Sequence, residues 1–315
     1  MKEIGGYLEL EQFVGKPYYS DLIAVNNARC ALLYLLRARS IKKLYIPYFL
    51  CHSVSGICDR EGYAYEYYHV GADFLPIFDK TLGTDEYLYV VNYYGQVSDE
   101  ALLRLKDRHG RIIFDNVQAF FRRPLRGIDT VYSCRKFFGV PDGGYLSTDV
   151  RLFDTLPQDE SRDRMKHILG RFEGSASDYY ADFRANDRSF VALELREMSR
   201  LTQNLLGAID YEAVRQKRNE NYTTLERLLG SYNRLPLTSP DGAYAYPFYC
   251  ENGATVRKKL AAEKIFVATL WPELPDATGE TERDYAENIL PLPCDQRYGV
   301  EDMNRMVAEV MKCLS

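Results

Sequence analysis

Several signals that would fix a function class are missing from this 315-residue chain. Its seven cysteines are odd in number and have no CxxC spacing, so neither a disulfide framework nor a zinc site is indicated. The four histidines include no HExxH pair, and no GxxxxGK[ST] loop occurs. We therefore expect reduced thiols and no metal site.

Membrane signals and a strong charge are also lacking. No apolar run approaches the length of a membrane span, and the N-terminus lacks the layout of a signal peptide. The formal net charge of −5 argues against non-specific nucleic-acid binding. We expect a cytoplasmic protein with neither a membrane nor a nucleic-acid partner.

What is present is an alternation of short apolar runs with helical patterns up to about residue 150. This alternation predicts an α/β fold with a largely parallel sheet, in which ligands bind at the carboxyl ends of the strands. The length suggests roughly two domains. The expected strands are 43–47, 63–68, 87–92, 111–114, 130–132 and 145–147.

The second half of the chain follows a different pattern. An amphipathic helical pattern runs from about Ala192 to Leu229, with Gly207 as a candidate break and Gly230 as a candidate C-cap. Beyond Pro236 we expect a small α+β lobe, with strands at 245–250 and 265–268, helices at 254–263 and 300–314, and an extended stretch at 288–293. The predicted organisation is a large domain at 1–230, with an irregular N-terminal arm at 1–21, and a small α+β domain at 231–315.

The most informative residue is Lys136, which follows a predicted strand and precedes Phe137, Phe138 and a glycine turn. Desolvation among apolar walls disfavours the ammonium form, and the amine becomes nucleophilic near neutral pH, as an imine-forming lysine requires. The alternative is a lysine that extends its charged end to solvent from the end of a strand.

Two further sites suit a ligand that has a heterocyclic ring and an anionic group. One is formed by Asp115 and Gln118, and the other is the helix start at 26–29. Asp115 directly follows a buried strand, where a carboxylate can hold a protonated ring nitrogen, and Gln118 can offer its amide to a nearby oxygen. The alternative for Asp115 is a helix cap. The helix start at 26–29 offers free N–H groups to an anion, although most helix starts bind nothing.

The set resembles the DegT/DnrJ/EryC1/StrS family of pyridoxal-phosphate sugar aminotransferases, which have the aspartate aminotransferase fold, fold type I. The resemblance covers most of the chain and rests on the order and spacing of its motifs. These are the helix start near Asn27, Pro47 ahead of a helix, VNYYG at 91–95, Asp115-x-x-Gln118, Lys136 with DGG at 142–144, and LPLPCDQRY at 290–298.

The resemblance implies a role for each candidate residue. Lys136 would form the Schiff base with pyridoxal 5'-phosphate (PLP), Asp115 would pair with the pyridine nitrogen, and Gln118 would approach the ring hydroxyl. The remaining cofactor contacts would be Asn27, Ala28 and Ser133 at the phosphate, and Cys51 or His52 over the ring face.

The resemblance also implies an activity and an assembly. The expected reaction is the transamination of a nucleotide-linked keto sugar in surface polysaccharide or related sugar biosynthesis, with glutamate as the amino donor and a homodimer as the assembly. A dehydratase branch of the family replaces the lysine with histidine, so Lys136 argues against that branch.

Two features depart from the family. Ser133 lies closer to the lysine than the usual serine, and the cross-subunit Gly-Tyr-Asn-Tyr-Arg stretch has no counterpart, since 179–184 stands in its place. These departures keep two alternatives open. One is a catalytically retired member that acts as a binding or scaffold protein, and the other is a PLP enzyme of a different reaction type.

Overall fold

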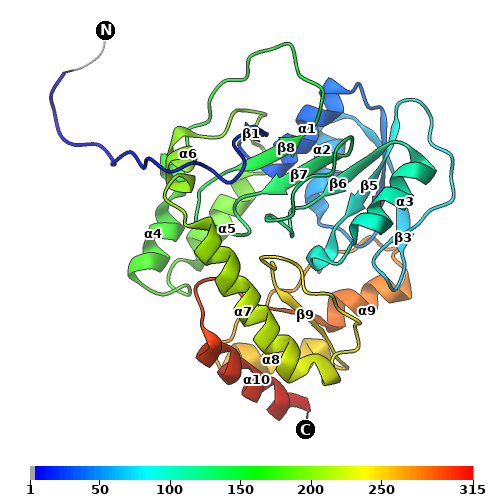
Figure 1. Cartoon of the computed structure of the whole chain (residues 1–315), viewed down its shortest axis with the longest axis vertical. Helices are drawn as coiled ribbons and strands as arrows, with labels where there is room; N and C mark the ends of the chain where they lie inside the picture. The colour runs from blue at the N-terminus through cyan, green and yellow to red at the C-terminus, as the bar shows by residue number, and fades with distance from the viewer. Residues whose placement is uncertain (1–3, 315) are drawn as a thin grey trace.

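The large part of the molecule is a layered α/β structure (Figure 1). The computed structural model describes residues 4–314, so residues 1–3 of the predicted arm and residue 315 of the predicted small domain lie outside it. Its sheet has the order β1-β8-β7-β6-β5-β2-β3-β4. The strands are β1 (Ile23–Val25), β2 (Lys43–Pro47), β3 (Ala64–Val70), β4 (Pro76–Ile77), β5 (Glu86–Val91), β6 (Ile112–Asp115), β7 (Asp129–Ser133) and β8 (Gly144–Ser147).

Strands β3, β2, β5, β6 and β7 run parallel, which confirms the predicted largely parallel sheet. Pairing joins Val91 to Asp115, and it joins Gly144 to both Ser133 and Val25. The carboxyl ends of parallel strands meet at one edge of a sheet. This edge therefore gathers the predicted site residues.

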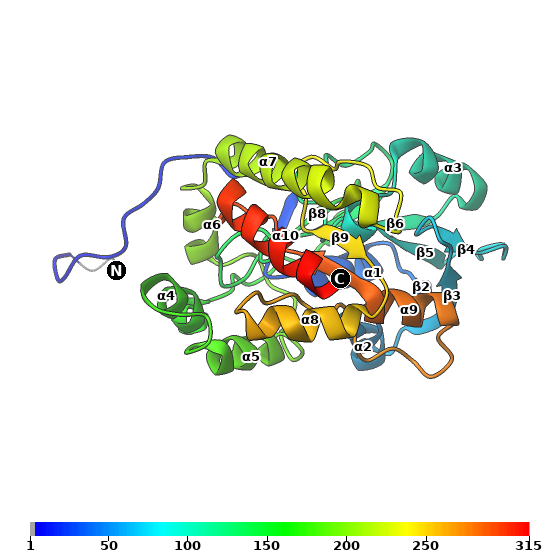
Figure 2. The same cartoon turned by 90° about the horizontal axis from the view of Figure 1, so that it is seen from below.

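Helices cover both faces of this sheet, with α3 and α2 on opposite sides of it (Figure 2). The run from Cys30 to Leu36 is buried throughout, so α1 is a core helix. By contrast, α3 is amphipathic, and Ser98 caps it by accepting a hydrogen bond from the backbone N–H of Ala101. The bounds are α1 (Ala28–Ala38), α2 (His52–Glu61) and α3 (Asp99–His109).

The middle of the chain forms separate helices instead of one long helical segment. The predicted helix from about Ala192 was wrong at its start, because 192–198 is not helical and Ser199 caps α6. Gly207 ends α6, Asp210 caps α7, and Gly230 ends α7, as the candidate break and cap predicted. The bounds are α4 (Lys166–Glu173), α5 (Tyr180–Ser189), α6 (Arg200–Leu206) and α7 (Tyr211–Leu229).

A second hydrophobic core lies between α7 and the C-terminal elements, and it includes Tyr222, Phe248, Leu260 and Met303. Because α7 contributes to this core, the domain boundary at residue 230 stays a prediction. Around the core, β9 and β10 pair antiparallel, and α10 packs on α7. The bounds are β9 (Tyr246–Tyr249), β10 (Ile289–Leu292), α8 (Gly253–Ala262), α9 (Glu280–Asn288) and α10 (Val300–Leu314).

The predicted strand at 265–268 was wrong. Ile265 and Val267 are buried while Phe266 is exposed, which is the alternation of a half-buried strand. No strand of residues 4–314 pairs with this segment. It is a loop whose buried apolar side chains pack into the second core. In the same range, no helix is long and apolar enough to cross a bilayer.

Candidate functional site

Lys136 lies in a hydrogen-bonded turn at the start of the loop 134–143, which joins β7 to β8. The N–H groups of Phe137 and Phe138 both donate to the Cys134 carbonyl and hold the turn closed. The lysine is partly buried, and its Nζ lies 5.6 Å from the centroid of the Tyr244 ring. Its charge also acts on the buried carboxyl of Asp115. The side chain therefore lies over the Tyr244 ring and is partly shielded from solvent.

Asp115 ends β6 and is only 4% exposed. Its Oδ2 accepts a hydrogen bond from the Tyr89 hydroxyl at 2.8 Å, and its Oδ1 accepts one from the Val117 N–H at 2.9 Å. Burial raises the pKa of Asp115, while the Lys136 ammonium and these two donors oppose the rise. No helix begins in the turn at 116–122 that directly follows β6, so the helix-cap alternative fails for this carboxylate.

Gln118 lies in the turn that follows Asp115 and is 1% exposed. Its Oε1 accepts a hydrogen bond from the N–H of Tyr94 at 2.8 Å, which fixes the direction of the amide. Its Nε2 is buried and has no partner among the described residues. Buried polar groups are normally paired, so this N–H₂ group is a donor that is free to bond a ligand or a water.

The start of α1 lies against β8. Asn27 Oδ1 caps the helix by accepting a hydrogen bond from the Cys30 N–H at 2.9 Å, while Asn27 Nδ2 has no partner among residues 4–314. A Cβ at Gly144 would lie 2.6 Å from the Asn27 carbonyl carbon, so glycine is needed for this close approach. Since Ser133 pairs with Gly144, the structure brings Asn27, Ala28 and Ser133 to one corner of the sheet.

The two candidates for the ring face differ in position. His52 lies exposed on α2, where its Nδ1 is 3.0 Å from the Ser55 hydroxyl of the same helix. Cys51 is partly buried at the N-cap position of α2. The structure thus shields Cys51 from solvent more than the imidazole of His52, and the choice between them at the ring face stays a prediction.

Two other residues of this edge, Tyr89 and Tyr244, carried no local signal in the sequence. Tyr89 and Tyr244 contact the two charged groups from strand β5 and from the segment before β9. The amide Nδ2 of Asn92 donates to Asn116 Oδ1 at 2.9 Å and ties the loop after β5 to the loop after β6. These partners are far apart in sequence, so no spacing rule could have found them.

The backbone next to Lys136 is held by the second core. Arg218 of α7 is 1% exposed, and its Nη2 donates to the Phe137 carbonyl at 3.2 Å. Its other nitrogens donate to the Ala243 carbonyl and to Gln296 Oε1, both at 2.8 Å. Gln296 Nε2 also donates to the Phe137 carbonyl at 2.8 Å. The position of the lysine turn therefore depends on α7 and on the loop before α10.

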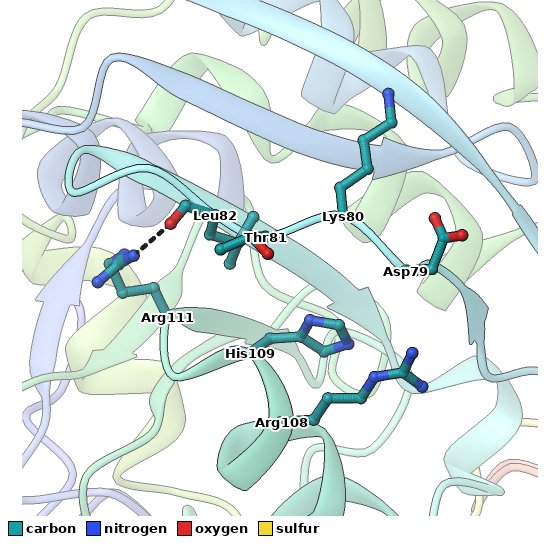
Figure 3. A pocket seen from close by; sticks show the side chains of 7 residues that line it. All are labelled: Asp79, Lys80, Thr81, Leu82, Arg108, His109 and Arg111. Carbon is teal, nitrogen blue, oxygen red and sulfur yellow. Dashed lines mark hydrogen bonds between the residues drawn. The ribbon is translucent and has the colours of Figure 1, made fainter.

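A cavity of about 240 Å³ lies elsewhere, and its lining side chains are shown in Figure 3. His109 ends α3 and Arg111 precedes β6, so this cavity lies at the opposite edge of the sheet from Lys136. Arg111 is already bonded to the Leu82 carbonyl at 2.8 Å. The cavity has no contact with the residues described above and is not the candidate site.

The buried carboxyl group of Asp142 makes the stability of the folded protein depend on pH. Burial raises its pKa from 3.8 to about 6, although the N–H and hydroxyl of Ser199 donate to it. The folded protein keeps this proton to a higher pH than the unfolded chain does. The stability contributed by Asp142 is therefore complete below about pH 4 and lost as the pH rises through about 6.

We expect the free energy of unfolding in urea to fall by up to roughly 3 kcal/mol over this range because of Asp142. The variant Asp142→Asn should lack this part of the pH dependence, while keeping an oxygen that accepts from Ser199. Urea titrations of both proteins at several pH values measure the difference. The same slope in both proteins would contradict the assignment.

Comparison with known proteins identifies the fold. No protein-family model and no curated protein matches the sequence. Among solved structures, S. venezuelae DesV in complex with a ketimine intermediate is 17% identical with a TM-score of 0.66, over 93% of this chain and 84% of its own. Bacillus subtilis NtdA with bound cofactor PMP is 15% identical with a TM-score of 0.68, over 94% of this chain and 73% of its own.

A third structure gives a similar result. A DegT DnrJ EryC1 StrS aminotransferase from Brucella abortus is 14% identical with a TM-score of 0.62, over 93% of this chain and 85% of its own. The α/β fold and the type of structural relative predicted from the sequence are both confirmed. This chain has the fold of the DegT DnrJ EryC1 StrS aminotransferases.

Proposed function

We propose that this protein is a PLP-dependent aminotransferase that acts on a keto sugar. The observation that carries the proposal is that Lys136 and the buried Asp115 lie at the same carboxyl edge of the sheet, where the charge of the lysine lowers the pKa of the carboxyl against the effect of burial. Its support from comparison is that the structural neighbours are sugar aminotransferases with PLP-form and PMP-form members.

The residues present fit the cofactor. The Asp115 carboxylate is oriented by Tyr89 and Val117 and can hold a protonated ring nitrogen. The unpartnered Nε2 of Gln118 suits a ring hydroxyl, and the free first-turn N–H groups of α1 suit a phosphate. Bound PLP supplies an electron sink for charge that develops at the substrate carbon.

Lys136 has two tasks in this proposal. Its Nζ holds the cofactor covalently before the amino donor arrives, and the freed amine then moves a proton at the substrate carbon as a general base and acid. The tight Cys134 turn and the hydrogen bonds to the Phe137 carbonyl keep this amine in place. An amine held in this way can reach both the cofactor and the substrate carbon without a large movement of the backbone.

The finer parts of the proposal concern the substrate and the assembly. We infer a nucleotide-linked sugar, glutamate as the amino donor and a role in surface polysaccharide or related sugar synthesis, by analogy with the fold relatives. A homodimer is supported by exposed apolar side chains on the N-terminal arm and on α4 and α5. These are Ile4, Tyr7, Leu8, Leu10, Phe13, Val14, Leu169, Phe172, Tyr180 and Phe183.

Binding of PLP tests the proposal directly. Purified protein mixed with PLP should gain a visible absorbance band, and borohydride reduction should fix the cofactor on Lys136, as identified by peptide mass spectrometry. The exposed Lys258 of α8 serves as the control, because Lys258→Ala should label as wild type does. Labelling of another lysine, or no labelling, would refute the cofactor assignment.

The half-reaction with glutamate distinguishes an active enzyme from a catalytically inactive family member that acts as a binding protein. Glutamate should convert the PLP absorbance to that of the amine form of the cofactor and release 2-oxoglutarate. A retired member would bind PLP at Lys136 but leave this absorbance unchanged. The observation that favours this second candidate is the helical pair α4 and α5 in place of the cross-subunit stretch of the family.

A further inference from the structure

The amine of Lys136 has few contacts that could hold its charge. It is partly buried, and it makes no hydrogen bond and no ion pair with any residue in the range 4–314. Its Nζ lies over the face of the Tyr244 ring, 5.6 Å from the ring centroid. The face of an aromatic ring attracts a cation at this distance. Tyr244 is therefore the side chain that contacts the charge of this amine.

One guanidinium holds together the backbones next to Lys136 and Tyr244. Arg218 donates from Nη2 to the carbonyl of Phe137, one residue after Lys136, at 3.2 Å. It donates from Nη1 to the carbonyl of Ala243, one residue before Tyr244, at 2.8 Å. Because a guanidinium is planar and rigid, its donors fix the distance between these two carbonyls. The amine and the ring therefore extend from backbone positions that are fixed relative to each other.

The turn before Tyr244 is also fixed. The N–H of Gly242 donates to Asn219 Oδ1 at 2.7 Å. Gly242 has a φ of +60°, and a Cβ at this position would lie 2.2 Å from a ring carbon of Phe121, so the close approach requires glycine. The Tyr244 ring packs beside the Phe137 ring, with 6.0 Å between the two centroids. The ring that faces the amine is thus held through its backbone and by a neighbouring side chain.

We propose that Tyr244 is a positioning residue that holds the amine of Lys136 and stabilises its charged form through the face of the ring. The ring has no atom that takes a proton from an ammonium group, whereas a carboxylate in hydrogen-bond contact would bind that proton. The amine can therefore be charged while it holds a proton and neutral after it has given the proton up. This inference rests on the proposed function for its purpose, because the lysine passes through both states when it moves a proton at the substrate carbon.

Reductive methylation of the protein without PLP tests this role. Formaldehyde and cyanoborohydride modify only the neutral form of an amine, and peptide mass spectrometry gives the rate at each lysine. Near pH 7, about two- to thirtyfold faster methylation of Lys136 is expected in Tyr244→Leu than in the wild type, because the charged form loses its partner. Tyr244→Phe keeps the ring and should react at the wild-type rate. The exposed Lys258 serves as the internal reference in every protein.

The pH dependence of the rate separates charge from access. A smaller side chain also opens space around the amine, and that effect raises the rate at every pH. The loss of charge stabilisation has no effect once the amine is neutral, so the rates of Tyr244→Leu and the wild type should converge toward about pH 11. Asp115 and Arg218, the charged groups on either side of the lysine turn, are unchanged in both proteins. An excess that is the same at every pH would overturn the inference.

Tyr298→Leu is the matched control, because this ring also lies under a cation, 5.2 Å from the central carbon of Arg297. Its Lys136 should react as in the wild type. Equal effects of Tyr244→Phe and Tyr244→Leu would assign the effect to the hydroxyl and overturn the role of the ring.

The same measurements keep this inference apart from the proposed function. Wild-type methylation of Tyr244→Leu near pH 7, in a protein that PLP labels at Lys136, would overturn the inference and leave the proposed function standing. Methylation that depends on the ring, in a protein that never labels with PLP, would refute the proposed function alone. If Tyr244→Leu does not fold, Tyr244→Met replaces it, because methionine also lacks an aromatic face.

Discussion

Replacing Lys136 with alanine should lower the turnover of transamination by at least about 10²- to 10⁴-fold, the usual contribution of a positioned acid and base. The reason is that, within residues 4–314, Lys136 is the only lysine whose charge affects the pKa of Asp115, so no neighbouring amine can take over the proton transfer. Release of 2-oxoglutarate from glutamate, followed over time, measures the loss. The Lys258→Ala variant should turn over at the wild-type rate.

The same variant should still bind PLP, because Asp115, Gln118 and the start of α1 are untouched. A small primary amine added to Lys136→Ala should restore part of the rate, since it can occupy the space that the side chain leaves. Wild-type turnover in this variant would show that Lys136 is not the reactive amine. Loss of the fold, checked by circular dichroism, would make the result uninformative about chemistry, and Lys136→Met then replaces alanine at nearly equal volume.

Replacing Arg218 with alanine should reduce the free energy of unfolding by about 3–5 kcal/mol. The change leaves a large void between α7 and the lysine turn, and the carbonyl of Ala243 loses the guanidinium donor. The Phe137 carbonyl keeps the Gln296 donor but loses its contact with the arginine. Urea unfolding at a fixed pH measures the effect.

Arg215 is the matched control, because it lies one turn earlier on the same helix. It pairs with Glu212 and Asp241 at the surface, and exposed pairs of this kind contribute at most about 1 kcal/mol. Arg215→Ala should therefore be nearly as stable as the wild type. Equal losses in the two variants would mean that the Phe137 contact has no special role.

The strand ends explain why much of the site could be predicted. Asp115 follows an apolar run that can only be a buried strand, and Asn27 opens a helix whose apolar residues recur at helical spacing. Both features are local, so spacing alone places them. The alternation of strands and helices then predicts a parallel sheet, whose geometry brings strand ends to one edge.

Predictions from local sequence patterns were wrong where a contact with a distant segment of the chain decides the secondary structure. The segment 265–268 has the alternation of a strand, but no strand in the described part of the chain pairs with it, so it remains a loop. The segment 192–198 has apolar residues at helical spacing, yet its backbone bonds to β1 and to the residue after it: the Met198 N–H donates to the Ala24 carbonyl, and the Asn26 N–H donates to the Arg196 carbonyl. A long-range hydrogen bond of this kind overrides helix propensity.

The sequence by itself determined that strands and helices alternate along the first half of the chain and which residue types follow the strands, because both depend on neighbours a few positions apart. Only the tertiary structure decided that the charge of Lys136 reaches Asp115 and that Arg218 holds the lysine turn. Those contacts join residues 21 to 81 positions apart, and their formation depends on how whole elements pack, which no local pattern encodes.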